Sequence, residues 1–368
     1  MDNRKYDKSL IDKIHEKEYV DNSEGIEILY KPVPDDDRPH AMDPRLYEIA
    51  SKKKQMFANR AKGGFKLSNE RYRPDKVTYD LCTVEIDTDE RLITINNDHM
   101  IDIYIYRRND VVGKTNLPAM VYLHGGGFTA GDIHLYEKQM KLIAELSGGV
   151  VIFPEYRLAP ECPFPGPIDD AYGAVDYIIE HSEELGIDSK KVMVAGDSAG
   201  GSLTNAVVLK DDKRRINQII ELYSAFDGRN YHDIKEYTWT YDEYEFLEEQ
   251  KDIEKSRVDR IKAPMDVPNA KAHNLYLQDK TTTEDPLVSA ICASDEILSN
   301  FPPTTLIYSE FDYLRVGNVY AGKKLKSLGV DVKLICYCGC DHGFLDMLGT
   351  VVQSEEVCGV IADSMKEM

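Results

Sequence analysis

The pattern of apolar and polar positions changes several times along the 368-residue chain. Up to about residue 75 the sequence is charged and interrupted by prolines, with helical spacing over residues 9–19 and 44–60. From residue 77 apolar residues alternate with polar ones, at 77–81 and again at 101–106, which predicts antiparallel strands with one face in water. Residues 118–123 are nearly all apolar and therefore predict a buried strand.

Beyond residue 123 the pattern predicts alternating helices and strands. Helical spacing covers 135–146 and 168–185, and short apolar runs cover 150–154, 191–195, 216–223, 304–309 and 332–337. This alternation is typical of the α/β class, with a mostly parallel central sheet and helices on both faces. The stretch between 227 and about 285 is too long for a simple connection, is rich in tyrosine, and includes a charged helical run over 244–261. An insertion of that length usually has a function.

A serine framed by glycines follows the strand expected at 191–195. The motif Gly196-x-Ser198-x-Gly200 predicts a nucleophile elbow, a strained turn between strand and helix where side chains at the two glycine positions would clash. The helix begins at once, so the amide of Ala199 points toward the place where negative charge develops on an attacked carbonyl group. Ser198 is therefore the candidate nucleophile.

A serine hydroxyl needs a histidine base and an acid that orients the histidine. His342 follows the last expected strand, and Asp312 follows the strand before it. Both lie just past the carboxyl ends of strands, where open α/β sheets bind ligands, and the order Ser, Asp, His is that of α/β-hydrolases. Asp341 and Glu310 are alternatives for the acid. Asp312 is preferred to Asp341 because neighbouring residues near a strand end are expected to point apart, and to Glu310 because Glu310 lies two residues closer to the strand.

Three successive glycines follow the buried strand at 118–123. Backbone amides without neighbouring side chains can face a substrate, so Gly126 and Gly127 are expected to donate hydrogen bonds to the same oxyanion as Ala199. His124, directly before the glycines, is expected to shape the loop rather than to transfer protons.

Together these motifs resemble the hormone-sensitive-lipase-like group of α/β-hydrolase fold esterases. The matching segments are His-Gly-Gly-Gly-Phe at 124–128, Tyr-Arg-Leu-Ala-Pro-Glu at 156–161, Gly-Asp-Ser-Ala-Gly-Gly at 196–201, Pro-Pro-Thr at 302–304, Asp-Tyr-Leu-Arg at 312–315 and His-Gly-Phe at 342–344. The resemblance covers about residues 77–366 and implies Ser198 as nucleophile, His342 as base and Asp312 as acid, with no cofactor. Glu155 and Ser224 depart from the group, which commonly has aspartate and proline there.

Members of this group carry a helical cap built from the N-terminus and an insertion. The resemblance therefore implies an N-terminal cap segment at 1–75, a first core part at 76–227, a cap insertion at 228–284 and a second core part at 285–368. Candidates for the substrate pocket are Phe128, Tyr156, Trp239 and Tyr241. For the aromatic residues of the cap, a place in the hydrophobic core of the cap is as much expected as a place in the wall of the substrate pocket.

Composition and charge limit the partners. The chain has 45 Lys and Arg against 65 Asp and Glu, a formal net charge of −20, which disfavours nucleic acid. It has neither a long apolar run nor an apolar signal segment, so we expect a soluble, cytoplasmic protein without stable membrane insertion. The spacing of Cys336, Cys338 and Cys340 fits no common zinc site, and no metal is expected. The sequence is compatible with a homodimer as well as with a monomer.

The expected function is hydrolysis of carboxylic esters through an acyl-enzyme on Ser198. Acetyl and other short acyl groups are favoured, up to about six carbons, because an acidic chain without an amphipathic anchor is poorly suited to a lipid surface. Two alternatives use the same scaffold: an amidase or peptidase with the same triad, and a small-molecule receptor that does not catalyse. The receptors of this kind have lost the histidine, whereas His342 is present here.

Overall fold

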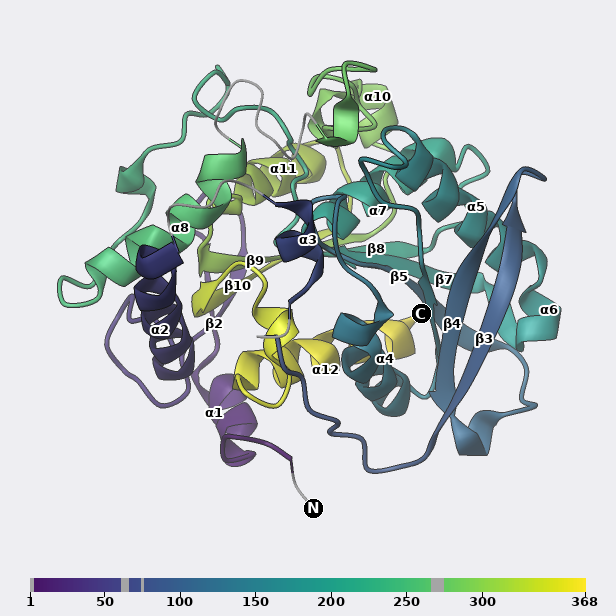
Figure 1. Ribbon diagram of the computed structural model, residues 1–368, viewed down its shortest axis with the longest axis horizontal. Coiled ribbons are helices and arrows are strands. Elements are labelled where there is room, and N and C mark those ends of the chain that lie inside the picture. The colour runs from purple at the N-terminus through teal and green to yellow at the C-terminus, as the bar shows by residue number, and fades with distance from the viewer. Residues whose placement is uncertain (1–2, 61–65, 74–75, 266–274) are drawn as a thin grey trace.

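The computed structural model describes residues 3–60, 66–73, 76–265 and 275–368, and these residues form one ten-stranded sheet with helices around it (Figure 1). The strand order is β1-β2-β10-β9-β8-β7-β5-β6-β4-β3. The strands are β1 Tyr19–Asp21, β2 Ile28–Lys31, β3 Ile86–Ile95, β4 His99–Arg108, β5 Leu117–Leu123, β6 Val150–Pro154, β7 Ile187–Asp197, β8 Gln218–Leu222, β9 Thr304–Phe311 and β10 Val332–Asp341. From β2 to β6 all neighbours are parallel, while β1, β4 and β3 add antiparallel edges.

Helices cover both faces of the sheet, which confirms the expected fold class. The apolar residues of α5 (Gly166–Glu180), α7 (Ala199–Lys210) and α11 (Arg315–Ser327) pack in one core. Those of α4 (Ile133–Ser147) and α12 (Val352–Glu367) pack in a second core on the other face. The central strands allow this because they are apolar on both sides; every residue of β9 is buried.

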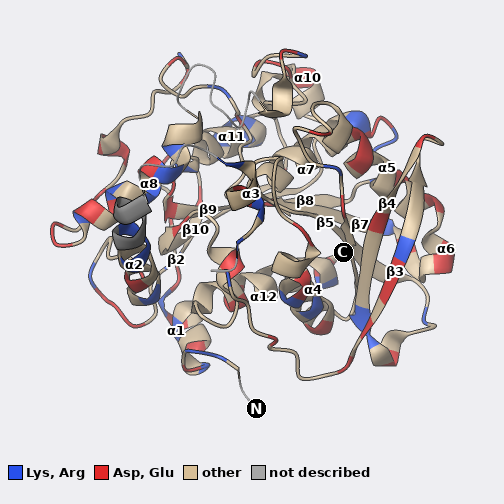
Figure 2. Cartoon of the chain, viewed as in Figure 1, with Lys and Arg blue, Asp and Glu red and all other residues tan. Residues whose placement is uncertain are grey.

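The remaining helices lie at the periphery and in the connections. They are α1 Ser9–Lys17, α2 Pro44–Arg60, α3 Leu67–Arg71, α6 Ser182–Leu185, α8 Lys251–Met265 and α10 Asp295–Leu298, with short 3-10 turns η1 Asn109–Val111, η2 Tyr241–Glu243, η3 Ala290–Cys292 and η4 Phe344–Met347. Charged residues are concentrated on these outer elements and on β3 and β4, while the central strands carry few (Figure 2).

The strand expected at 77–81 is wrong. The segment lies along the loop after η4, where the amide of Tyr79 donates to the carbonyl oxygen of Leu348 at 3.1 Å and the Tyr79 ring packs on Gly349. Leu81 is buried in the core beneath. Val77, the first of the alternating apolar residues, is 51% exposed, so the period of two in the sequence does not correspond to one buried face.

The N-terminal strands β1 and β2 were not expected. β2 pairs in parallel with β10, from Ile28 opposite Leu334 to Lys31 opposite Tyr337. Residues 28–31 therefore belong to the sheet, and the assignment of all of 1–75 to a cap is wrong for this part. Four residues followed by Pro32 are too short for a clear period of two.

Two expected helices have different limits. The run at 168–185 is broken at His181 into α5 and α6. The helix expected at 244–261 begins only at Lys251. The residues before it are held in the cap instead, because the rings of Tyr244 and Phe246 stack on each other with centroids 5.7 Å apart.

The N-terminal segment after β2 packs beside the insertion. α2 contacts α8, and the two lie side by side in Figure 1. The amide of Met42 donates to Oε1 of Gln250 at 2.8 Å, and Arg38 pairs with Glu249 at 2.9 Å. We therefore propose a cap that combines 44–73 with 228–284; within it, residues 61–65 and 266–274 lie outside the described part.

Candidate active site

Ser198 lies on the turn between β7 and α7 with φ 52° and ψ −120°, a conformation that is costly for any residue with a side chain. A Cβ atom on Gly200 would lie 1.9 Å from the carbonyl oxygen of Leu123, and one on Gly196 would lie 2.5 Å from Gly200. Glycine at both positions therefore allows the two backbones to cross. The amide of Ser198 donates to the carbonyl of Leu222 at 2.8 Å, which anchors the turn to β8.

Ser198, His342 and Asp312 form one chain of hydrogen bonds. Nε2 of His342 lies 2.8 Å from Oγ of Ser198, and Nδ1 lies 2.7 Å from Oδ2 of Asp312. Asp312 is fully buried, and its other carboxylate oxygen accepts the amide of Leu314 at 3.1 Å. A carboxylate on Nδ1 holds the proton there and leaves Nε2 able to accept the hydroxyl proton. The structure thus brings together three residues that are far apart in sequence. The His342 ring also packs against Tyr223 at a centroid distance of 4.8 Å.

Asp341, the neighbour of His342, is bound to the cap and forms no hydrogen bond with the imidazole ring among the described residues. Its Oδ2 accepts a hydrogen bond from Nε of Arg257 at 2.5 Å and lies 3.7 Å from a guanidinium nitrogen of Arg260. Burial would raise the pKa of this carboxyl group, but the two guanidinium groups outweigh burial and hold the pKa below its usual value. Asp341 is therefore an ionised anchor for α8.

Glu310, the second alternative acid, is also bound elsewhere. It accepts the amide of Gly339 at 2.7 Å and lies 2.7 Å from Nδ1 of His40. The hydrogen bond to Glu310 raises the pKa of His40. Of the three carboxylates considered, Asp312 is the one in contact with His342.

The loop after β5 bends sharply at its glycines. Gly126 has φ 133° and Gly127 has φ 62°, and a Cβ atom on Gly126 would lie 1.9 Å from the carbonyl oxygen of Ala130. Within the part of the chain that the structure describes, the amides of Gly126, Gly127 and Ala199 donate no hydrogen bond. These amides are therefore available to a bound oxygen atom.

Asp197 joins this loop to the elbow, a role the sequence analysis did not assign. Its carboxylate accepts the amide of Gly125 at 2.7 Å and the hydroxyl groups of Tyr122 and Tyr136 at 3.0 and 3.1 Å. A Cβ atom on Gly125 would lie 2.4 Å from the Asp197 side chain. Burial raises the pKa of Asp197 despite these donors. The feature of the sequence that could have indicated this role is an acidic residue directly before the nucleophile.

His124 supports the loop from behind. It is buried, its Nδ1 lies 2.8 Å from the carbonyl oxygen of Gly125, and its ring stacks on Tyr156 at 4.2 Å. Burial lowers the pKa of His124 to about 4, so the ring is neutral near pH 7. Tyr156 donates to the carbonyl oxygen of His124 at 2.6 Å and is itself almost fully buried, which makes it part of the same support.

The other pocket candidates differ in their surroundings. Phe128 is half-buried and stacks on Tyr276 at 3.8 Å. Trp239 is buried and its ring lies 4.7 Å from that of Tyr241, so both belong to the packed interior of the cap. Trp239 donates to the hydroxyl of Tyr244 at 2.8 Å, which in turn donates to the carbonyl oxygen of Asp312 at 2.9 Å.

A second link between cap and core was also missed. Arg71, at the end of α3, donates from Nε to the carbonyl oxygen of Thr129 at 2.9 Å and from its terminal nitrogen to that of Ala159 at 3.0 Å. It also forms an ion pair with Glu161. Arginine in a charged, proline-broken segment gives no sequence signal for such a contact.

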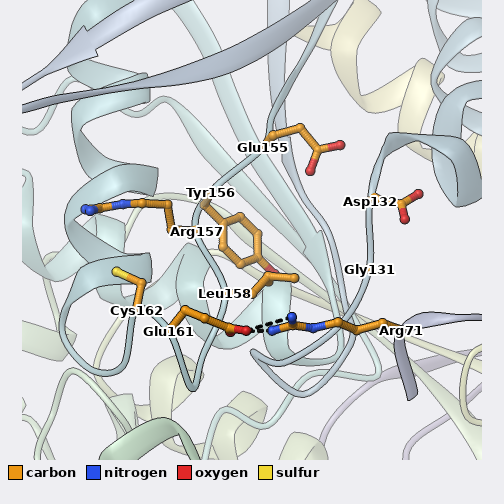
Figure 3. A pocket seen from close by; sticks show the side chains of 9 residues that line it. All are labelled: Arg71, Gly131, Asp132, Glu155, Tyr156, Arg157, Leu158, Glu161 and Cys162. Carbon is orange, nitrogen blue, oxygen red and sulfur yellow. Dashed lines mark hydrogen bonds and ion pairs between the residues drawn. The ribbon is translucent and has the colours of Figure 1, made fainter. Parts of the chain in front are cut away.

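A pocket of about 550 Å³ lies beside this link (Figure 3). Its lining residues are Arg71, Gly131, Asp132, Glu155, Tyr156, Arg157, Leu158, Glu161 and Cys162. Burial raises the pKa of Glu155 to about 7. None of these lining residues belongs to the chain of Ser198, His342 and Asp312, while Tyr156 and Arg71 also support the glycine loop.

Among the residues with described positions, no group of three or more His, Cys, Asp or Glu side chains is arranged to hold a metal ion. Cys336 and Cys340 are buried thiols, and Cys338 is a half-buried one. None of the described helices combines the length and the apolar character needed to cross a bilayer.

The family model for the alpha/beta hydrolase fold matches residues 120–346, a range that holds the elbow, the glycine loop and the histidine. The chain belongs to this family. An esterase from Gibberella moniliformis is 31% identical over 247 residues, which are 66% of this α/β-hydrolase and 71% of the fungal protein. An ethyl acetate hydrolase from Pseudomonas putida is 26% identical over 75% of the chain and 81% of that protein. The solved structure of a Pyrobaculum calidifontis esterase covers 89% of this α/β-hydrolase and 99% of its own chain, with 27% identity and a TM-score of 0.66. These similarities confirm the expected family and the enzyme class, a carboxylesterase-type hydrolase.

Proposed function

We propose that this α/β-hydrolase cleaves short-chain carboxylic esters through an acyl-enzyme on Ser198. The observation that carries the proposal is the continuous chain of hydrogen bonds from Oγ of Ser198 through His342 to the buried Asp312. Ser198 alone would be a weak nucleophile, and this chain supplies the base that it needs.

In the proposed mechanism Oγ of Ser198 attacks the ester carbonyl carbon while its proton passes to Nε2 of His342. The carbonyl oxygen becomes an oxyanion and accepts hydrogen bonds from the amides of Gly126, Gly127 and Ala199. His342 then protonates the alcohol, which leaves. Water loses a proton to His342 and attacks the acyl carbon, and Ser198 regains its proton as the carboxylic acid departs.

Short acyl groups are proposed because the cap fills its own interior. Trp239 packs with Tyr241 and Tyr244 within the cap. Arg71 and Arg257 tie cap segments to the catalytic loops. A long acyl chain would have to displace these contacts. The relative named for ethyl acetate hydrolysis supports the same size class. We propose an optimum at or below about six carbons, declining gradually, since each methylene contributes only about 1–3 kcal/mol.

The test is a series of 4-nitrophenyl esters from two to twelve carbons, assayed with the wild type and Ser198→Ala. The variant is expected to lose about 10⁴- to 10⁶-fold in kcat. A serine-directed phosphonate should label the wild type at Ser198, as read by peptide mass spectrometry, and should not label the variant. Retention of a tenth of the activity by Ser198→Ala would refute the assignment. A rate maximum on twelve-carbon esters would refute only the size class.

A further inference from the structure

The cap insertion at 228–284 donates hydrogen bonds to the backbone of two candidate catalytic residues. The hydroxyl group of Tyr244 donates to the carbonyl oxygen of Asp312 at 2.9 Å. The guanidinium group of Arg260 donates to the carbonyl oxygen of His342. Asp312 directly follows β9 and His342 directly follows β10, so both acceptors lie where core strands end. The acid and the base are thus each attached to a strand on one side and bound to the cap on the other.

The hydrogen bond from Tyr244 has a fixed direction. Nε1 of Trp239 donates to the Tyr244 hydroxyl oxygen at 2.8 Å, and both side chains are buried. Because an indole N–H can only donate, the tyrosine oxygen is the acceptor there, and its own proton goes to the carbonyl oxygen of Asp312. That carbonyl oxygen also accepts the amide of Arg315 at 3.1 Å, so both of its lone pairs are used. The turn that carries the acid is therefore bound by α11 and by the cap.

Arg257 and Arg260 are three residues apart on α8 and bind successive residues of the core. Arg257 donates from Nε to the side chain of Asp341 at 2.5 Å, and Arg260 donates to the carbonyl oxygen of His342. Residues three apart share a face of a helix, which explains how one face of α8 reaches both. α8 contacts β9, and it lies beside β9 and β10 in Figure 1. The peptide that carries the imidazole ring is therefore fixed by a cap helix as well as by β10.

The hydrogen bonds between the catalytic side chains depend on where these two peptides lie. Nε2 of His342 is 2.8 Å from Oγ of Ser198, and Nδ1 is 2.7 Å from Oδ2 of Asp312, distances at which hydrogen bonds are well formed. A shift of either peptide moves its side chain, and a misplacement of about 1 Å can cost about 10²-fold in rate. Tyr244 and Arg260 contact the backbone, so their effect on the reaction passes through the positions of the acid and the base.

We propose that Tyr244 and Arg260 are positioning residues of the candidate active site. Through their hydrogen bonds the cap holds the catalytic acid and base at the distances that proton transfer from Ser198 requires. This rests on the proposed function and gives the cap a role beyond limiting the size of the acyl group. Loss of either hydrogen bond is expected to lower kcat and to leave KM nearly unchanged, because the contacts that bind the ester remain.

The first test uses Tyr244→Phe, which removes the hydroxyl group and keeps the ring that stacks on Phe246. Its matched control is Tyr231→Phe, because the Tyr231 side chain is also buried and its hydroxyl donates to the backbone carbonyl oxygen of Asp227 at 3.0 Å. With 4-nitrophenyl butyrate, kcat should fall about tenfold in Tyr244→Phe, with KM within about twofold of the wild type, and stay unchanged in Tyr231→Phe. The loss should persist when Tyr244→Phe is combined with Trp239→Phe, which leaves no buried indole N–H without a partner.

The second test uses Arg260→Met and Arg260→Lys. Methionine removes both the donor and the charge, whereas lysine keeps a charged donor on a long aliphatic stem. We therefore expect kcat to fall about tenfold in Arg260→Met and to recover partly in Arg260→Lys. Lys251→Met is the control, because it removes an exposed cation from the first turn of α8 and should leave kcat unchanged.

Each kcat is divided by the fraction of protein that a serine-directed phosphonate labels at completion. A partly unfolded variant has fewer labelled molecules but an unchanged kcat per labelled molecule, whereas a displaced acid or base lowers this value and slows the labelling itself. An unchanged kcat per labelled molecule in Tyr244→Phe or Arg260→Met would overturn the role of that residue, while hydrolysis by the wild type left the esterase assignment intact. A wild type that neither hydrolyses the ester nor reacts with the phosphonate would contradict the proposed function, and the positioning roles with it.

Discussion

Asp341 and Arg257 form a partly buried ion pair, with 2.5 Å between Oδ2 and Nε, directly beside His342. The carboxylate next to the histidine in sequence is therefore bound to the cap, and the carboxylate 30 positions earlier is the one that contacts the imidazole ring. The structure in this way separates an anchoring acid from an orienting acid.

The two acids are expected to respond differently to removal of their charge. Asp312→Asn should lower kcat by roughly 10⁴-fold, because the amide favours the wrong tautomer of the histidine. Asp341→Asn should cost far less in kcat, since it weakens the contact with α8 and leaves the Nδ1 partner in place. Steady-state kinetics on one short ester gives both values. Equal losses would mean that the orienting acid has not been identified.

The link from Arg71 to the glycine loop gives a second prediction. Arg71→Met keeps the aliphatic stem but removes the hydrogen bonds to Thr129 and Ala159, so the loop that holds the proposed oxyanion donors becomes less well fixed. We expect kcat to fall by about tenfold, the size of one hydrogen bond to a charged group. Arg108→Met, which removes a surface pair with Asp110, serves as control. An identical loss in both variants would argue against a specific role for Arg71.

Trp239 is expected to act through the stability of the cap. Its buried ring contacts Tyr241, Tyr244 and Tyr313, so Trp239→Ala should destabilise the protein by about 3–5 kcal/mol. Thermal unfolding followed by circular dichroism measures this. Trp239→Phe keeps much of the packing and removes only the hydrogen bond to Tyr244. A Trp239→Ala variant with an unchanged melting temperature but an altered chain-length optimum would place Trp239 in the substrate pocket instead.

A buried acid beneath the site predicts a pH dependence of stability. Burial raises the pKa of Glu221 to about 8, with Ser224 and Asn205 as its hydrogen-bond donors. The folded state therefore keeps a proton that the unfolded state releases above its ordinary pKa of about 4.5, and stability falls as the pH rises from about 4.5 to about 8.

Glu221→Gln has no such proton to lose, so its melting temperature should fall less than that of the wild type over this pH range. The comparison of melting temperatures at pH 5 and pH 8 needs only the two proteins, with Glu90→Gln on the exposed face of β3 as control. Parallel pH profiles of wild type and Glu221→Gln would show that Glu221 is ionised throughout.

The sequence predicted those helices and strands whose apolar pattern can be recognised from neighbouring residues alone. The apolar runs of β6, β7, β9 and β10 and the helical spacing of α2 and α4 were identified because burial on both faces, or on one stripe, is visible in the residues themselves. The order of Ser198, Asp312 and His342 was sufficient to predict which residues meet. The glycines were informative because close backbone approach admits no other residue there.

The contacts that were missed join segments distant in sequence. Nothing in the residues near Arg71 indicates the carbonyl groups it binds, and nothing near Asp341 indicates Arg257. Asp197 was visible within the motif, but its part in joining two loops appears only when Tyr122 and Tyr136 are placed around it. The segment at 77–81 shows the converse, because its alternation was real while the partner strand it suggested was absent among the described residues.

The pairing of β2 with β10 also determines when, during synthesis of the chain, β2 can join the sheet. The two strands are separated by about 300 residues, so at 5–20 residues per second roughly 15–60 s of translation pass between the synthesis of β2 and that of its parallel partner. During that interval Ile28 and its neighbours can pair only with β1, and the other edge of β2 has no partner strand. The early part of the nascent chain is therefore where a holding chaperone would act, and β2 joins the sheet only once β10 has been synthesised.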